Sequence, residues 1–224
     1  MRTLQRTRRR DLIILIGLLS LACISSMVVA IFILSRQQVT EALPLTVSGP
    51  VQPTHTVAYT QITGLNGYTP AKTAAQSWAE DAQLVWANTT WPKIITVEQV
   101  GEPTSWTYRF YSPTKARFFF VTVAPDGQVE TIEHQAQVSL PPGPIAPDSW
   151  LIDSPTALAI WLDNGGETVL RNNPGLEMVI QLRSVNNSPN PVWLVVGLNK
   201  QTEEIHAVVI DANQGTVTAT KLGS

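Results

Sequence analysis

Residues 12–34 constrain this chain more than any other feature, because none of these 23 residues carries a charge. A helix rising about 1.5 Å per residue would span roughly 34 Å here, enough to cross a bilayer core of about 30 Å. A helix buried in a soluble core is the alternative, but such helices nearly always carry a polar face. The sequence therefore predicts a transmembrane helix at residues 12–34, in contact with membrane lipid.

The charges beside this segment predict its orientation. Five arginines precede it and one follows it closely: Arg2, Arg6, Arg8, Arg9 and Arg10 before, and Arg36 after. The positive-inside rule then makes residues 1–11 a cytoplasmic basic tail and places the rest of the chain outside the cytoplasm. We therefore expect a single-pass protein of the cell membrane with an extracytoplasmic C-terminal domain.

Two processing signals are alternatives to a permanent anchor. A cleaved signal peptide has an apolar stretch of about 7–15 residues and a small-x-small cleavage site, and residues 12–34 fit neither. The run Ser-Leu-Ala-Cys at residues 20–23 resembles a bacterial lipoprotein site, but Ser20 stands where an aliphatic residue is expected. A lipidated cysteine is normally followed by a polar tether, whereas eleven uncharged residues follow Cys23. We therefore interpret Cys23 as an inert residue in the bilayer.

Charge composition excludes some classes of protein. Only 14% of the residues are charged, against roughly 25% in typical soluble domains. Residues 37–224 hold nine basic and sixteen acidic side chains, a net charge of -7, which does not fit a nucleic-acid partner. The single cysteine excludes a disulfide framework and a multi-cysteine metal site.

The exported part contains a diverged internal repeat. Ala74-x3-Trp78 is echoed by Ala157-x3-Trp161, and each tryptophan is followed 13 or 14 positions later by a proline. Trp106 then corresponds to Trp193, and each is followed 21 or 22 positions later by a glycine. The one large difference in spacing falls in residues 184–191, a Ser-, Asn- and Pro-rich loop. Landmarks in one order indicate a duplication.

Each copy predicts one helix followed by four strands, an α+β unit with the helix on one face of an antiparallel sheet. Thr69-Pro70 and Ser154-Pro155 are predicted helix starts, and Gly165-Gly166 is expected to break the second helix. The first helix is expected to extend as far as Trp86. Strands are expected at residues 93–100, 105–111, 116–124 and 128–134, and again at 176–184, 192–198, 204–211 and 216–221.

This reading divides the exported part into four segments. Residues 35–69 form a Pro-, Thr- and Ser-containing stalk, residues 70–138 the first repeat, residues 139–152 a proline-rich linker and residues 153–224 the second repeat. The predicted fold is therefore a transmembrane helix followed by two separate repeats of a helix on a four-stranded antiparallel sheet.

The second repeat resembles a PepSY domain. Its closing hairpin, residues 208–217, reads Val-Val-Ile-Asp-Ala-Asn-Gln-Gly-Thr-Val, in which Asp211, Ala212, Gly215 and Val217 match that family's pattern and Gln214 replaces the usual threonine. The first repeat matches more loosely. The resemblance implies a non-catalytic domain that holds or restrains a protein partner in the bacterial envelope, as in propeptides of thermolysin-like metallopeptidases. It also implies that Asp211 and Gly215 form a turn.

The remaining motifs predict no catalytic residue, no cofactor and no metal site. The only cysteine is Cys23, and there is no Gly-x-Ser-x-Gly elbow, Walker loop, dinucleotide fingerprint or His-Glu-x-x-His. Acidic residues adjoin a histidine at residues 130–134 and 203–206, which we interpret as solvated edge charges rather than metal ligands. The alternative to a non-catalytic protein is an enzyme of unfamiliar type, without any of these motifs.

Tryptophans are the most suggestive side chains. Trp78, Trp106, Trp161 and Trp193 recur in phase and are predicted core anchors. Trp91 and Trp150 fall outside that phase; a structural role is favoured for them, and they are also the candidate partner contacts, because tryptophan is over-represented in binding hot spots. The sequence thus predicts a non-enzymatic envelope protein whose tandem domain binds or restrains a protein partner, a peptidase among the candidates. An accessory subunit of a larger membrane complex is the alternative function.

Overall fold

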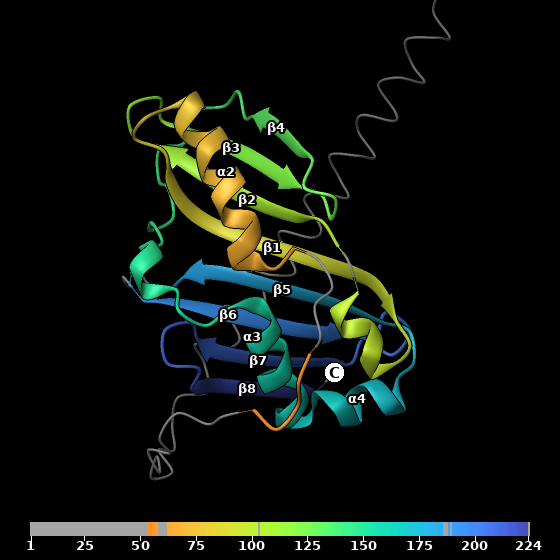
Figure 1. The fold of residues 1–224 in the computed structure, drawn as a ribbon. Helices are drawn as coiled ribbons and strands as arrows, with labels where there is room; N and C mark the ends of the chain where they lie inside the picture. Colours follow the sequence, from red (N-terminus) through yellow and green to blue (C-terminus); the bar gives the residue numbers. More distant parts are fainter. Residues whose placement is uncertain (1–52, 58–61, 103, 186–187, 189, 224) are drawn as a thin grey trace, which may run out of the picture. The chain divides into compact units, whose positions relative to one another are not determined.

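A computed structural model of the chain describes residues 53–57, 62–102, 104–185, 188 and 190–223 (Figure 1). All described residues belong to one compact unit, Ser48–Ser224. The predicted transmembrane segment, residues 12–34, lies outside the described residues. Among the helices that are described, none has the length and apolar character needed to span a bilayer.

One continuous antiparallel sheet of eight strands organises the domain, in the order β4-β3-β2-β1-β5-β6-β7-β8. The strands are β1 (Gln83–Ile94), β2 (Trp106–Ser112), β3 (Arg117–Val123), β4 (Val129–Glu133), β5 (Leu176–Ser184), β6 (Pro191–Leu198), β7 (Ile205–Asp211) and β8 (Val217–Gly223). The helices are α2 (Gly64–Trp78), α3 (Ser154–Trp161) and α4 (Glu167–Asn172), with a π-helical segment, Leu162–Gly166, between the last two. Short 3-10 turns lie at Val97–Gly101 and Pro147–Ser149.

The prediction of two separate four-stranded units is wrong, because the two sets of strands join along β1 and β5. These strands pair antiparallel from Trp86 opposite Arg183 to Trp91 opposite Met178. An isolated four-stranded sheet would leave the N–H and C=O groups along the edge of β1 unpaired, and pairing with β5 satisfies both edges at once. The result is one sheet with two outer edges, β4 and β8.

Strand β1 also occupies residues predicted to be helical. Helix α2 ends at Trp78, and Val85 and Trp86 lie in the strand. Buried and half-buried residues alternate along β1, with Val85, Ala87 and Thr89 facing the core. Packing against both neighbouring strands therefore outweighs the 3–4-residue spacing of apolar side chains that fits a helix.

Helix α2 begins six residues earlier than the predicted start at Thr69-Pro70. The side chain of Thr63 accepts a hydrogen bond from the Asn66 amide, so Thr63 is the N-cap. The Tyr108 hydroxyl donates to the Gly64 carbonyl over 2.7 Å. A Cβ at Gly67 would collide with the Tyr108 hydroxyl, so glycine there permits this approach, and a Cβ at Gly64 would meet the rings of Trp106 and Trp193 at 3.2 Å.

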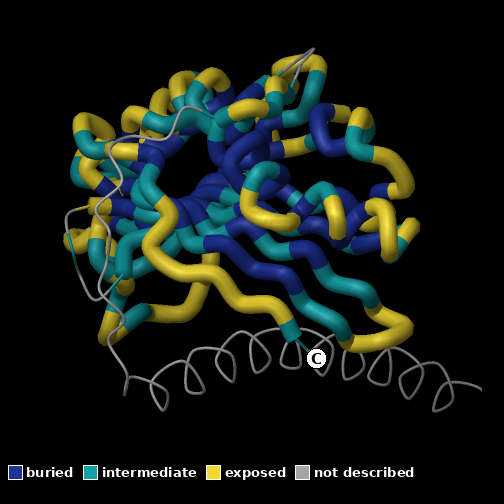
Figure 2. The backbone as a smooth tube through the Cα atoms, turned by 90° about the horizontal axis from the view of Figure 1, so that it is seen from below, coloured by how far each residue is buried: buried dark blue, intermediate teal, exposed yellow. Residues whose placement is uncertain are grey.

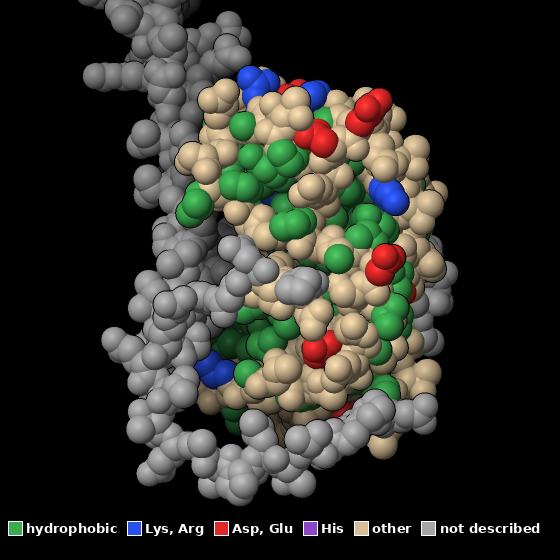
Figure 3. All heavy atoms as spheres, turned by 90° about the vertical axis from the view of Figure 1, so that its left-hand side faces the viewer, with side chains coloured by type: hydrophobic (Ala, Val, Ile, Leu, Met, Phe, Trp, Pro, Cys, Tyr) green, Lys and Arg blue, Asp and Glu red, His purple; other side chains and the backbone are tan. Residues whose placement is uncertain are grey.

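The described helices lie on one face of the sheet (Figures 1 and 2), with α2 over the β1–β3 part and α3 over β6 and β7, as the labels of Figure 1 show. Between them the rings of Trp106 and Trp193 meet with centroids 6.0 Å apart, and Trp150 stacks edge-on against Trp193 at 5.7 Å. This aromatic cluster spans the β1–β5 junction and makes one continuous core. Charged side chains are sparse among polar and hydrophobic atoms on the side shown in Figure 3.

Candidate functional site

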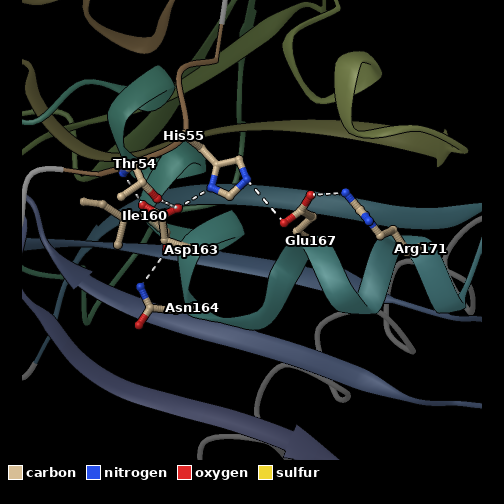
Figure 4. Close-up of polar contacts among 7 residues, drawn as sticks. All are labelled: Thr54, His55, Ile160, Asp163, Asn164, Glu167 and Arg171. Atoms are coloured by element: carbon tan, nitrogen blue, oxygen red, sulfur yellow. Dashed lines mark hydrogen bonds and ion pairs between the residues drawn. The ribbon is translucent and has the colours of Figure 1, made fainter.

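Polar contacts of Thr54 and His55 join the segment before α2 to the π-helical segment between α3 and α4 (Figure 4). Thr54 donates to Asp163 from both its backbone amide and its hydroxyl, each over 2.6 Å. His55 Nδ1 contacts the same carboxylate, and its Nε2 lies 3.4 Å from Glu167 Oε2. We call Thr54, His55, Asp163 and Glu167 the stalk clamp, because they fasten the predicted stalk to the domain.

The clamp depends on the π-helical segment between α3 and α4. Gly165 has φ of +100°, a conformation that glycine adopts without strain, and Asn164 Nδ2 donates to the Ile160 carbonyl over 2.7 Å. This is the interruption expected at Gly165-Gly166. It places Asp163 and Glu167 on the side of the helix that meets His55, as Figure 4 shows. π-helical segments are often associated with functional sites.

The clamp favours the charged forms of both partners. The hydrogen bond with Asp163 is the main cause that raises the pKa of His55 above its ordinary value, and Glu167 adds to it. Burial alone would raise the pKa of Asp163, but hydrogen bonds from Thr54 and His55 outweigh it and lower that pKa. The clamp is therefore strongest with His55 protonated and Asp163 ionised, and it weakens as pH rises through the pKa of His55.

A second histidine lies on the inner side of the same segment. His206 of β7 is buried beneath the helix, with its ring centroid 5.5 Å from that of Trp161. A side-chain atom at Gly165 would approach the His206 ring to 3.4 Å. Burial lowers the pKa of His206. The kinked segment thus separates an outer histidine that favours its protonated form from an inner one that favours its neutral form.

The stalk clamp is not arranged as a nucleophilic site. The Thr54 hydroxyl donates to Asp163 rather than to the imidazole, and His55 Nε2 faces Glu167 instead of a hydroxyl or thiol. Within the described ranges, no group of three or more His, Cys, Asp or Glu side chains could hold a metal ion. The arrangement can bind and release a segment of chain with pH.

A second candidate site lies on the opposite face of the sheet. Trp86, Arg109, Phe118 and Phe120 project there from β1, β2 and β3, and we call them the aromatic–arginine cluster. The Arg109 guanidinium lies 4.8 Å from the Trp86 ring, 5.3 Å from Phe118 and 4.9 Å from Phe120. All four residues are half-buried. No described helix lies over this face.

The cluster has unused hydrogen-bonding capacity. Trp86 Nε1 and Arg109 Nε are shielded from solvent and have no hydrogen-bond partner in the described part of the chain. Burial lowers the pKa of Arg109, and no ion pair among the described residues includes it. A partner that brings a carboxylate would pair with the Arg109 guanidinium.

Trp91 and Trp150, the tryptophans named as candidate partner contacts, lie inside the core, as the favoured structural role implies. Trp91 is 5% exposed and donates to the Glu102 carbonyl, and Trp150 is 2% exposed and donates to the Ile152 carbonyl. Trp106, Trp161 and Trp193 are completely buried. Trp78 is only partly buried, stacked on Phe119 with Lys115 over its ring.

The residues of the predicted closing turn lie as the resemblance implies. Asp211 Oδ1 accepts from the amides of Asn213 and Gln214, and Gly215 has φ of +72°. Of the acidic groups beside histidines, Glu133 pairs with Arg117. His206 is buried away from the exposed Glu203. These contacts are structural.

Sequence reasoning did not find either candidate site. His55 and Asp163 are 108 positions apart, and residues 53–57 show no periodic pattern. Arg109 and Trp86 could be found only from the pairing of β1 with β2, because alternation alone puts them on the same face without bringing them together.

Comparison with known proteins leaves the family open. No family model matches the chain, and no curated protein matches it. A search of solved structures gives a predicted lipoprotein from Clostridium difficile 630, which is 10% identical. That match covers 79% of this chain and 100% of that chain with a TM-score of 0.41.

Proposed function

We propose that this chain is a non-enzymatic, single-pass membrane-anchored envelope protein whose extracytoplasmic domain binds or restrains a protein partner. The uncharged run at residues 12–34 and the arginines before it support the anchor and its orientation. The resemblance of residues 208–217 to the PepSY hairpin supports a restraining role. A peptidase is one candidate partner.

The aromatic–arginine cluster is the observation that carries the proposal. Trp and Arg are among the residue types most enriched in positions that dominate protein-binding energy, and here they lie together on a sheet face that no described helix covers. Arg109 lacks a described counter-ion, and Trp86 and Arg109 both retain an unused donor.

Site-specific crosslinking tests this function. A photoreactive amino acid at Thr122, beside the cluster on β3, is expected to capture one envelope protein in native membranes. The same amino acid at Lys72 on α2 is the matched control and is expected to capture none. The double variant Trp86→Ala, Arg109→Ala should remove the Thr122 product while leaving the chain folded. Equal capture from both positions, or from neither, would exclude this face as a partner surface.

An accessory subunit of a larger membrane complex is the second candidate. Small residues within the uncharged segment favour it, because they allow close helix packing in a bilayer: Gly17, Ser20, Ala22, Ser25 and Ser26. Co-migration with a complex on a mild-detergent native gel, lost when these residues are replaced by leucine, would support it. Monomeric migration of the native chain would contradict it.

A further inference from the structure

Among the described residues, no strand pairs with the outer edge of β8. It is the last strand in the sheet order, and all residues from Val217 to Leu222 are exposed. Its inner edge pairs regularly with β7 from Ala219 opposite Val209 to Gly223 opposite Ile205. Alternate residues of β8 therefore direct N–H and C=O groups away from β7, into solvent.

The edge of β8 lacks the protection found at the other edge. Strand β4 has five residues, of which Glu130 and Glu133 are acidic. Strand β8 has seven residues, and its only charged side chain is Lys221. A register shift near Thr218 disrupts pairing at the start of β8, but the stretch from Ala219 onward is regular. A regular, weakly charged edge is a template for another strand.

The side chains beside this edge specify the chemistry of the strand that fits. Leu222 and Val217 are 63% and 38% exposed, and both lie on the helix-covered face, opposite the inward residues His206 and Ile210. Lys221 and Ala219 lie on the other face. An added strand would therefore place apolar side chains beside Leu222 and a carboxylate beside Lys221.

We propose that β8, from Ala219 to Gly223, binds an extended acidic–apolar segment of another protein by strand addition. The proposal goes beyond the function above, because it uses an edge that the aromatic–arginine cluster does not reach. A second copy of this chain fits less well. Antiparallel pairing of two β8 strands would bring both Lys221 side chains to one face within about two residue positions, where like charges repel.

Peptide binding to the full-length chain in detergent micelles tests this directly. The probe is a fluorescein-labelled heptapeptide of alternating valine and glutamate, compared with its valine–lysine counterpart and with a version N-methylated at its three central amides. Fluorescence anisotropy measures affinity, and amide hydrogen exchange locates the site. We expect exchange to slow at residues 219–223 but not in β4.

The expected affinities follow from the contacts. The glutamate peptide should bind about fivefold tighter than the lysine peptide, and Lys221→Glu should reverse that order. N-methylation should weaken binding at least about tenfold, because it removes donors from both edges of the peptide. Lys72→Glu on α2 is the matched charge control and should change nothing. Unaltered exchange in β1 and β5 shows that each variant is folded.

Several results would overturn the proposal. Protection confined to β4, no protection at residues 219–223, or a preference that Lys221→Glu leaves unchanged would each exclude strand addition at β8. Formation of a stable dimer that protects the same residues without peptide would assign the edge to a second copy instead. These outcomes are separate from those of the proposed function, which is tested by crosslinking from Thr122 on the face around Trp86.

Discussion

Replacement of Leu182 by alanine tests whether the domain is one sheet. Leu182 lies on β5, is completely buried, and stands between Ala87 of β1 and Trp193 of β6. It therefore contributes to the core of both sets of strands at their junction. If the two sets were separate units, this change would affect only the second.

The expected cost follows from complete burial. Leucine-to-alanine changes in a protein core cost about 2.7–5.0 kcal/mol, depending on how far the site can collapse. Ala87 opposite Leu182 is already small, so its methyl group cannot fill the space and a value of about 3–4 kcal/mol is expected. With a urea slope of about 2 kcal/mol per molar, the midpoint should fall by roughly 1.5–2 M.

Amide hydrogen exchange measured along a urea series reports the loss of stability separately for strands β2–β3 and for strands β6–β7. The free energy of opening should fall by the same amount in segments 106–123 and 193–210, because both belong to one cooperative unit. Leu194→Ala is the matched control, since Leu194 lies half-buried on the uncovered face, and it should cost less than about 1.5 kcal/mol. A shift in segment 193–210 with none in segment 106–123 would refute the single-sheet reasoning.

Three further predictions concern the core, the kink and the clamp. Trp161→Ala should cost about 3–5 kcal/mol because its side chain is completely buried, whereas Trp78→Ala should cost about 1–2 kcal/mol, and equal losses in urea melts would contradict this. Gly165→Ala should cost about 1 kcal/mol or more because of its φ of +100°, and a melt unchanged from the native chain would argue against the kink. An NMR titration should give His55 a pKa above 6.5 that falls in Asp163→Asn, so the clamp is complete below pH 6.5 as long as Asp163 stays ionised and is lost as pH rises through the raised pKa of His55. A His55 titration that Asp163→Asn leaves unaltered would exclude the clamp.

Local pattern predicted the strands of the second half closely. The expected bounds of β5 agree with the structure, and those of β6 and β7 differ by one residue at one end. Alternation between turn residues is a local signal, so no knowledge of neighbours is needed. The prediction for residues 82–86 was wrong because it relied on the same kind of local signal. Ala82, Val85 and Trp86 are 3–4 positions apart or adjacent, a spacing that also fits one face of a helix. Only the pairing with β2 and β5 decides that segment, and pairing is not local.

The candidate sites depend on contacts across long sequence separations. The aromatic–arginine cluster requires the register of three strands, and the stalk clamp joins residues more than a hundred positions apart. The sequence did indicate the kink that forms the clamp, through Gly165-Gly166. It could not indicate which chain segment docks there, because a short segment such as residues 53–57 contributes no periodic signal.

The stalk clamp holds residues 53–57 against the π-helical segment between α3 and α4. Val57 and Ile62 also pack against the core, so loss of the His55 contacts alone would free only part of the segment before α2, which begins at Gly64. Because the clamp weakens as pH rises through the pKa of His55, residues 53–55 should be held on the domain when His55 is protonated and released from Asp163 at higher pH.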